Sequence, residues 1–184
     1  MVGTALANGL RESGHTPVSI TRRESEASGG IVWNPASSRN DFSRLQTVST
    51  VVHLAGENIA AGRWTPALKD RIRRSRIEGT RNLVQSIAGI TQRPSTLICA
   101  SATGFYGERG DTILDEDSPP GQGFLADVCG GWEKEAQAAT ELGLRVVNVR
   151  IGVVLSSKGG ALSKMLLPFR LGAGGIIGTG KQYW

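Results

Sequence analysis

Hydroxyl and basic side chains follow a short apolar run near the start of the chain. Thr21 closes this run, and Arg22 and Arg23 come directly after it. A guanidinium can hold a phosphate through paired, charge-assisted hydrogen bonds, and a threonine hydroxyl can donate to the same group. An ordinary basic turn has the same composition, so the pattern by itself leaves a phosphate site and a solvated turn open.

A second segment combines an apolar run with small residues at its end. Residues 50–55 are rich in valine and finish with Leu54 and Ala55, and Gly56 follows. A small residue and a glycine at the end of a strand let a flat ligand approach the backbone closely. His53 belongs to the same run, and its position predicts a packed strand residue rather than a catalyst.

These side chains must be positioned by alternating strands and helices. The pattern predicts strands over residues 17–21, 50–55, 97–100 and 145–151, and helices over residues 3–13, 65–90 (one or two helices) and 124–142. Thr65 and Pro66 have the residue types of a helix N-cap and a first helical position. Strands separated by helices require parallel crossovers. The sequence therefore predicts an α/β fold, a Rossmann-type doubly wound parallel sheet, in a single domain of residues 1–184.

In such a fold the end of the second strand faces the adenosine ribose of a bound dinucleotide. The predicted strand 17–21 corresponds to this second strand, because the chain begins after the position of the first. A carboxylate at this point would accept hydrogen bonds from the two ribose hydroxyls of NAD, whereas this chain has Arg22. Because a guanidinium binds a 2′-phosphate and not a pair of hydroxyls, the sequence favours NADP(H).

Five motifs resemble, in order, segments of the extended short-chain dehydrogenase/reductase superfamily, in particular its epimerase-like branch, which is related to NAD-dependent epimerases and dehydratases. They are LAGEN at 54–58, GTRNL at 79–83, FYG at 105–107, WEKEA at 132–136 and RIGVVL at 150–155. The resemblance implies NADP(H) as cofactor and a set of cofactor-binding residues, namely Gly3, Thr21, Arg22, Leu54, Ala55, Gly56, Arg76 and Val154. For Arg76 a solvated helix face is an equal alternative, and for Val154 a plain buried strand.

The catalytic residues are less well defined. Residues 100–107 resemble the superfamily segment SSxxxYG, whose hydroxyl polarises a substrate carbonyl, and this implies Ser101, Thr103 and Tyr106 as catalytic candidates. The YxxxK pair, which supplies the proton donor of the superfamily, is absent from the sequence. One alignment places Leu125 and Cys129 in its two positions, and the other places Asp127 and Gly131 there.

Two classes of function therefore stay open. The first is an NADP-dependent oxidoreductase or epimerase relative that passes a hydride between the nicotinamide and a carbonyl or an alcohol. The second is a non-catalytic NADP(H) sensor, which the absent YxxxK pair favours. The substrate, a small molecule, and the oligomeric state are not specified by the residues.

The two ends of the chain differ from the superfamily pattern. Val2 and Gly3 match the last two positions of the glycine loop GxTGFIG, so we expect a fold that is incomplete at both ends. The first strand, most of the glycine loop and the C-terminal substrate domain would be missing. Because the first strand is central in the order 3-2-1-4-5-6, we expect residues 1–184 alone to be poorly stable and to bind NADP(H) weakly.

Composition excludes several other classes. The net charge is +5, but the basic cluster of residues 69–76 spreads over more than one helix face and has no interleaved aromatic residues, so we expect no nucleic-acid partner. Cys99 and Cys129 lack CxxC spacing, and we expect neither a disulfide framework nor a metal site. No apolar run approaches the roughly 18 residues of a membrane span, so we expect a cytoplasmic protein.

Overall fold

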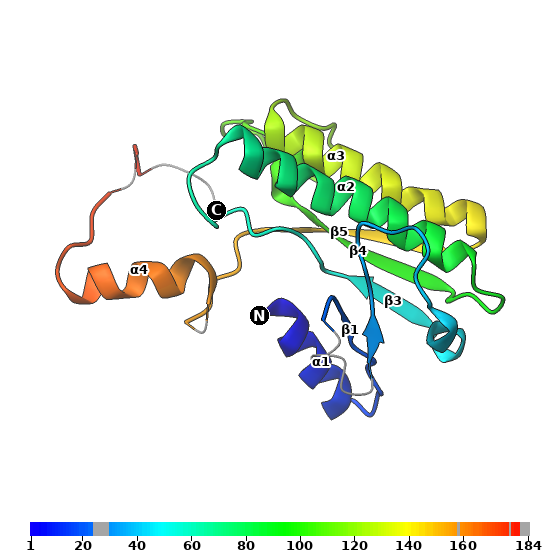
Figure 1. The fold of residues 1–184 in the computed structure, drawn as a ribbon. Coiled ribbons are helices and arrows are strands. Elements are labelled where there is room, and N and C mark those ends of the chain that lie inside the picture. The colour runs from blue at the N-terminus through cyan, green and yellow to red at the C-terminus, as the bar shows by residue number, and fades with distance from the viewer. Residues whose placement is uncertain (24–29, 158, 177, 181–184) are drawn as a thin grey trace. The chain divides into compact units, whose positions relative to one another are not determined.

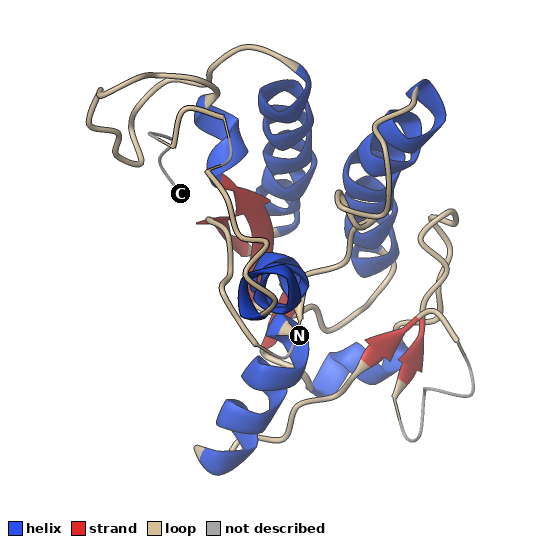
Figure 2. Ribbon diagram, turned by 90° about the vertical axis from the view of Figure 1, so that its left-hand side faces the viewer, coloured by secondary structure: helices blue, strands red, loops and turns tan. Residues whose placement is uncertain are grey.

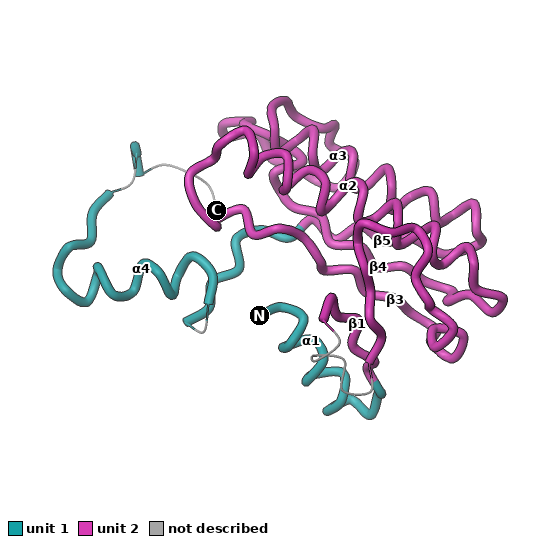
Figure 3. The backbone as a smooth tube through the Cα atoms, viewed as in Figure 1, with its two compact units in different colours: residues 1–16, 151–184 teal, residues 17–150 magenta. Residues whose placement is uncertain are grey.

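The computed structural model describes residues 1–23, 30–157, 159–176 and 178–180. The chain divides into two compact units, which Figure 3 distinguishes by colour. Unit 2 contains residues 17–150, and unit 1 contains residues 1–16 and 151–184. Figure 1 labels the elements of both units.

The strands of unit 2 form two sheets. β1 (Ile20–Thr21) pairs in parallel with β2 (Ile31–Val32), and a second sheet has the order β3 (Thr50–His53), β4 (Thr96–Ala102), β5 (Arg145–Ile151). β3 and β4 are parallel, with His53 opposite Cys99. This arrangement confirms the predicted α/β class with parallel, Rossmann-like pairing. The described strands form two sheets rather than one continuous sheet.

Two long helices lie side by side on one face of the three-stranded sheet (Figures 1 and 2). They are α2 (Pro66–Ala88) and α3 (Phe124–Gln137). Thr65 caps α2, because its side chain accepts a hydrogen bond from the Leu68 N–H, and Pro66 occupies the first turn, where a missing N–H costs nothing. α2 is thus a single helix.

The core of unit 2 forms where these helices meet the sheet. Leu68 and Ile72 of α2 pack with Val128 of α3, and Phe124 covers this cluster. Further buried apolar residues come from α2, the sheet and α3, namely Leu83, Val84, Ile87, Val51, Leu97, Ala126 and Ala136. Burial of these side chains is the main favourable contribution to the folding of unit 2.

The described part of unit 1 contains the helices α1 (Val2–Glu12) and α4 (Gly160–Arg170). Neither helix has a buried residue. Large apolar side chains near α4 are strongly exposed, with Leu171 at 74% and Ile176 at 83%.

The element boundaries differ from the sequence prediction in identifiable ways. β1 is shorter than the predicted strand 17–21, which begins at Pro17, a residue without an N–H to donate to a strand partner. The predicted strand 50–55 ends at His53. The predicted helix 124–142 changes to a 3₁₀ helix, η4 (Ala138–Leu142), after α3. Neither β2 nor α4 was predicted, and β2 has only two residues, too few to show a period.

Candidate functional site

Arg76 of α2 reaches back to the carboxyl end of β3. Its Nη1 donates to the carbonyl oxygen of Glu57 at 3.0 Å and, less closely, to that of Ile72 at 3.4 Å. A Cβ placed on Gly56 would lie 3.1 Å from the Arg76 Cζ. The absence of a side chain at Gly56 therefore gives room to the Arg76 guanidinium, and the predicted approach of a flat ligand to this glycine stays a prediction.

Within the described residues no carboxylate forms an ion pair with Arg76, although the charge of Glu57 favours the protonated guanidinium from a distance. Burial lowers the pKa of its guanidinium, because the charged form loses hydration. The neighbouring carboxylate of Glu57 lies 3.5 Å from the Arg71 side chain instead. Within the described residues, the Nε and Nη2 groups of Arg76 donate no hydrogen bond. A half-buried cation with unused donors is suited to an anionic ligand.

The turn after β3 is fixed to the middle of α2. The Glu57 N–H donates to the Ser75 hydroxyl at 2.9 Å, and that hydroxyl donates to the Ile72 carbonyl at 3.0 Å. Leu54 and Ala55 precede this turn and are half-buried. The segment 54–57 thus presents its backbone next to Arg76.

His53 lies beneath this turn. It is buried in β3, as predicted, and its Nε2 lies 3.0 Å from the Thr80 hydroxyl. The rings of Trp33 and Trp132 meet its ring edge to face. Burial lowers the pKa of His53 to about 4, so the ring is neutral at pH 7.

Thr21 and Arg22 lie at the carboxyl end of β1. The Thr21 hydroxyl donates to the Arg23 carbonyl at 2.9 Å, and this hydrogen bond stabilises the turn after β1. Arg22 is exposed, and among the described residues it forms no ion pair. Its guanidinium is therefore accessible to a phosphate.

Gly3 and Val154 belong to unit 1, whereas Thr21, Arg22, residues 54–56 and Arg76 belong to unit 2. Gly3 lies in the first turn of α1, and Val154 follows β5 with 38% of its surface exposed. The predicted cofactor residues are thus distributed over both units.

The catalytic candidates Ser101 and Tyr106 belong to one hydrogen-bond network. The Ser101 hydroxyl donates to Glu133 Oε1 at 2.6 Å, and Glu133 accepts two hydrogen bonds of 2.9 Å from Arg150. Arg150 also donates to the Tyr106 hydroxyl at 2.9 Å, and Tyr106 donates to the Asp115 carbonyl at 2.8 Å.

Arg150 is the centre of this network. Its Cζ lies 3.6 Å from the centre of the Phe105 ring, and hydrogen bonding to Glu133 raises the pKa of its guanidinium. The network joins β5, α3 and the 3₁₀ helix η3 (Thr103–Tyr106). Glu133 and Arg150 are both largely buried, so each charge is compensated mainly by the other and little by solvent.

The three candidates therefore differ in what their hydroxyls can do. Ser101 is buried and bonded, and Tyr106 both donates and accepts. Thr103 is exposed at the start of η3 and, within the described residues, its hydroxyl has no hydrogen bond. Sequence reasoning assigned no role to Glu133 or Arg150. The available signal was an acid in WEKEA and a base in RIGVVL, without any indication that they meet.

Neither alignment places two exposed ionisable side chains at the positions of the YxxxK pair. Cys129 is buried, and burial raises the pKa of its thiol. Leu125 packs near Gly104, where an added Cβ would lie 3.3 Å from the Leu125 Cβ. Asp127 is exposed in the first turn of α3, and its partner position is Gly131.

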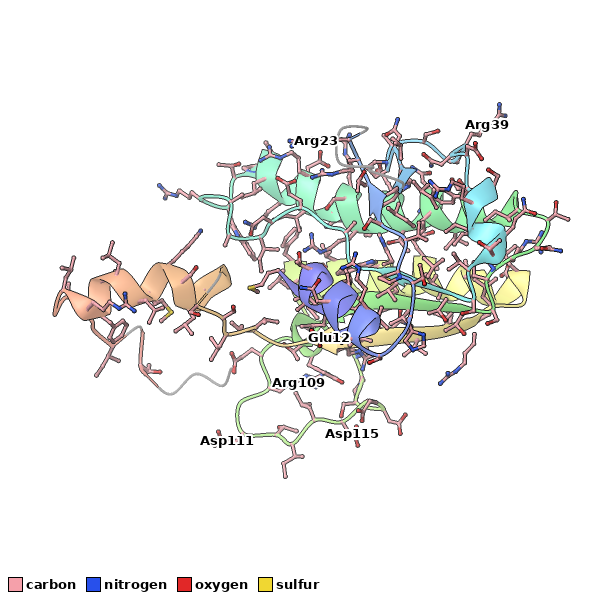
Figure 4. All side chains as sticks on the ribbon, turned by 90° about the horizontal axis from the view of Figure 1, so that it is seen from below. Glu12, Arg23, Arg39, Arg109, Asp111 and Asp115 are labelled. Atoms are coloured by element: carbon pink, nitrogen blue, oxygen red, sulfur yellow. The ribbon has the colours of Figure 1, made fainter. Side chains whose placement is uncertain are left out.

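The loop after η3 packs closely against the backbone of Tyr106. A Cβ on Gly121 would lie 2.0 Å from the Tyr106 carbonyl oxygen, so only glycine fits there. Arg109 fixes the loop by donating to the carbonyl groups of Tyr106, Pro119 and Pro120. Figure 4 labels Arg109, Asp111 and Asp115 along this loop. A pocket here is lined by Glu108, Arg109, Pro120, Gly121 and Gln122.

The described residues lack both a metal-binding cluster and a membrane-spanning helix. No group of three or more histidine, cysteine or acidic side chains is arranged to hold a metal ion in this part of the chain. Among the helices that the structure describes, none combines the length and the apolar character needed to cross a bilayer.

The parallel α/β fold and the cationic end of β3 define a Rossmann-like protein. The chain belongs to the NAD-dependent epimerase/dehydratase family, whose model matches residues 1–183. An epimerase family protein of Mycobacterium bovis is 43% identical over 183 residues, which cover all of this chain and 60% of that protein. The chain therefore spans less than two thirds of the length of this relative.

Two solved structures are also similar. The nucleoside-diphosphate sugar epimerase from Corynebacterium glutamicum has a TM-score of 0.82 and 39% identity, over 98% of this chain and 37% of that one. The human epimerase family protein SDR39U1, solved with NADPH, has a TM-score of 0.81 and 35% identity, over 99% of this chain and 60% of that one. These relatives confirm the fold class and the superfamily that the motifs indicated.

Proposed function

We propose that this chain carries an NADP(H)-binding site at the carboxyl ends of β1 and β3. The observation that carries the proposal is the Arg76 guanidinium, which is half-buried beside Gly56 and has donors that no described residue uses. A bound phosphate would accept hydrogen bonds from these donors and pair with the guanidinium charge. The similar human protein, solved with NADPH, supports a dinucleotide in this type of site.

Arg22 provides the preference for NADP(H) over NAD(H). Its side chain is exposed next to Thr21 at the end of β1, where the class places the adenosine ribose. The guanidinium would hold the 2′-phosphate, and Leu54, Ala55 and Gly56 would border the adenosine. Gly3 and Val154 belong to unit 1, and their cofactor roles stay predictions from the motif resemblance.

The proposed activity is that of an oxidoreductase or epimerase relative. A bound NADP(H) would supply or accept a hydride at a carbonyl or an alcohol. Among the three catalytic candidates, Thr103 is best suited to donate to a substrate oxygen, because its hydroxyl is exposed and unbonded within the described residues. Ser101 and Tyr106 would act through the network around Arg150.

A non-catalytic NADP(H) sensor is the second candidate function. It is favoured by the engagement of the Ser101 and Tyr106 hydroxyls with Glu133, Arg150 and Asp115. A hydroxyl that is already bonded in this way must give up a partner before it can transfer a proton.

Binding of NADPH and NADH, followed by cofactor fluorescence, tests the proposed site. We expect the full chain to bind NADPH more tightly, and we expect Arg22→Gln to lose about tenfold in NADPH affinity while NADH affinity is unchanged. Arg39→Gln, at an exposed arginine elsewhere, is the matched control. Equal affinity for both cofactors in the unmodified chain would refute the role of Arg22.

Turnover separates the two functions. The protein is incubated with NADPH and panels of carbonyl compounds, and with nucleotide sugars, and absorbance at the nicotinamide band and sugar products are followed. Consumption or epimerisation that Thr103→Val abolishes supports the enzyme. Binding of NADPH without any turnover supports the sensor.

A further inference from the structure

Trp132 of α3 lies against the guanidinium that the proposed function uses. The Arg76 Cζ is 5.0 Å from the centre of the Trp132 ring, within the range of a cation–π contact. Trp132 is only 4% exposed, so this contact is largely shielded from water. His53 is a second neighbour of the ring and meets it edge to face, with 6.4 Å between the ring centres. The indole therefore has contacts with both Arg76 and His53.

Three groups restrict the Arg76 guanidinium. Gly56 borders it, the Glu57 carbonyl accepts from its Nη1, and the Trp132 ring lies beside it. A free arginine side chain loses considerable rotamer freedom when it binds a ligand. These contacts remove part of that freedom beforehand, and they leave the Nε and Nη2 donors without a partner among the described residues.

We propose that Trp132 is a positioning residue that orients Arg76 for a phosphate of the dinucleotide. The proposal rests on the proposed NADP(H) site and adds the residue that sets its affinity. The cation–π contact favours the charged guanidinium and restricts it at the end of β3, so that a phosphate meets preorganised donors. Trp132 itself does not touch the ligand.

A double-mutant cycle tests this proposal in the full chain. We expect Trp132→Leu to weaken NADPH binding by about tenfold and Trp132→Phe, which keeps an aromatic face, to weaken it much less. In an Arg76→Met background, Trp132→Leu should have no further effect on affinity. If the two substitutions instead weaken binding additively, Trp132 does not act through Arg76 and the proposal is overturned.

Trp64 provides the matched control. It is an exposed tryptophan whose ring contacts Lys69 rather than Arg76. Trp64→Leu should leave NADPH affinity unchanged, and a loss equal to that of Trp132→Leu would contradict the proposal. Binding of NADH by Trp132→Leu shows which phosphate Arg76 holds, because NADH has the diphosphate but lacks the 2′-phosphate. An equal loss of affinity for NADH and NADPH assigns Arg76 to the shared diphosphate. A loss of affinity for NADPH alone assigns Arg76 to the 2′-phosphate.

Fluorinated tryptophan gives a second test that does not depend on the folding of Trp132→Leu. Fluorine withdraws electron density from the ring face and weakens a cation–π contact with little change of shape. NADPH affinity should fall stepwise with the number of fluorines in the unmodified chain but stay constant in Arg76→Met. No dependence on fluorination would overturn the proposal. A failure of the unmodified chain to bind either cofactor would refute the proposed function, and this inference with it.

Discussion

The two units of this chain differ in how they use apolar side chains. In unit 2, α2 and α3 bury residues such as Ile72, Leu83 and Val128 against each other and against the sheet. In unit 1, α1 and α4 bury none, and side chains such as Leu167 and Leu171 are exposed. An apolar helical pattern therefore indicates a helix but does not show that its apolar face is covered. Most of the proposed cofactor residues lie on the unit that has its own core.

The largest effect should come from a cavity in the core of unit 2. Ile72→Ala removes a fully buried side chain packed with Leu68 and Val128, and we expect it to lower the free energy of unfolding by about 3 kcal/mol. Leu167→Ala, in α4 of unit 1, should change it by no more than about 0.5 kcal/mol. Urea unfolding measures both. Similar losses for the two variants would show that the units do not differ as described.

A pH dependence should come from the buried histidine of unit 2. The pKa of His53 is about 4 in the folded state, below the ordinary 6.5, so the unfolded chain binds the proton first as pH falls. Stability is therefore full above about pH 6.5 and is lost between there and pH 4, by up to about 3 kcal/mol.

His53→Gln should remove this slope from the difference between the variant and the unmodified chain. His15→Gln, at an exposed histidine of unit 1, is the control and should leave the slope unchanged. The measurement is urea unfolding at several pH values between 4 and 8. An unchanged slope in His53→Gln would assign the pH dependence to other groups.

A smaller effect is expected from the ion pair between β5 and α3. Arg150→Met leaves the largely buried Glu133 carboxylate without its partner, and we expect a loss of about 2 kcal/mol, reduced from the value of a fully buried pair because some solvent reaches both groups. Arg81→Met breaks the more exposed pair with Glu135 between α2 and α3 and should cost no more than about 1 kcal/mol. Thermal or urea unfolding ranks them, and the reverse order would contradict this comparison.

The smallest effects are expected from alanine substitution of one glycine in each unit. Gly9 lies inside α1 with no atom near its would-be Cβ, so Gly9→Ala should stabilise that helix by about 0.5 to 1 kcal/mol. Gly56→Ala would displace the Arg76 guanidinium by a few tenths of an ångström, and NADPH affinity should fall about threefold without a large change in stability. Circular dichroism and fluorescence titration measure these changes. Unchanged NADPH affinity in Gly56→Ala would argue against a fixed Arg76.

Local signals determined much of the fold. Valine-rich and isoleucine-rich runs located β3, β4 and β5, and Thr65 with Pro66 located the start of α2, because strand propensity and helix capping act within a few residues. The motifs also indicated the family, which the comparisons confirm, whereas the cofactor roles of the positions after β1 and β3 stay predictions. They did not reveal β2, which is too short for a periodic pattern.

Only the tertiary structure decided which of the predicted side chains work together. Ser101 and Tyr106 are joined through Glu133 and Arg150, which lie on other elements, and Arg76 is placed by Gly56 and Trp132. Such contacts join residues that are distant in sequence, and they depend on how α2 and α3 pack on the sheet. The sequence by itself determined the chemical types at the strand ends. The packing determined that the Thr103 hydroxyl stays available and that the Arg76 guanidinium is restricted. Burial and orientation depend on neighbours that the chain brings together only when it folds.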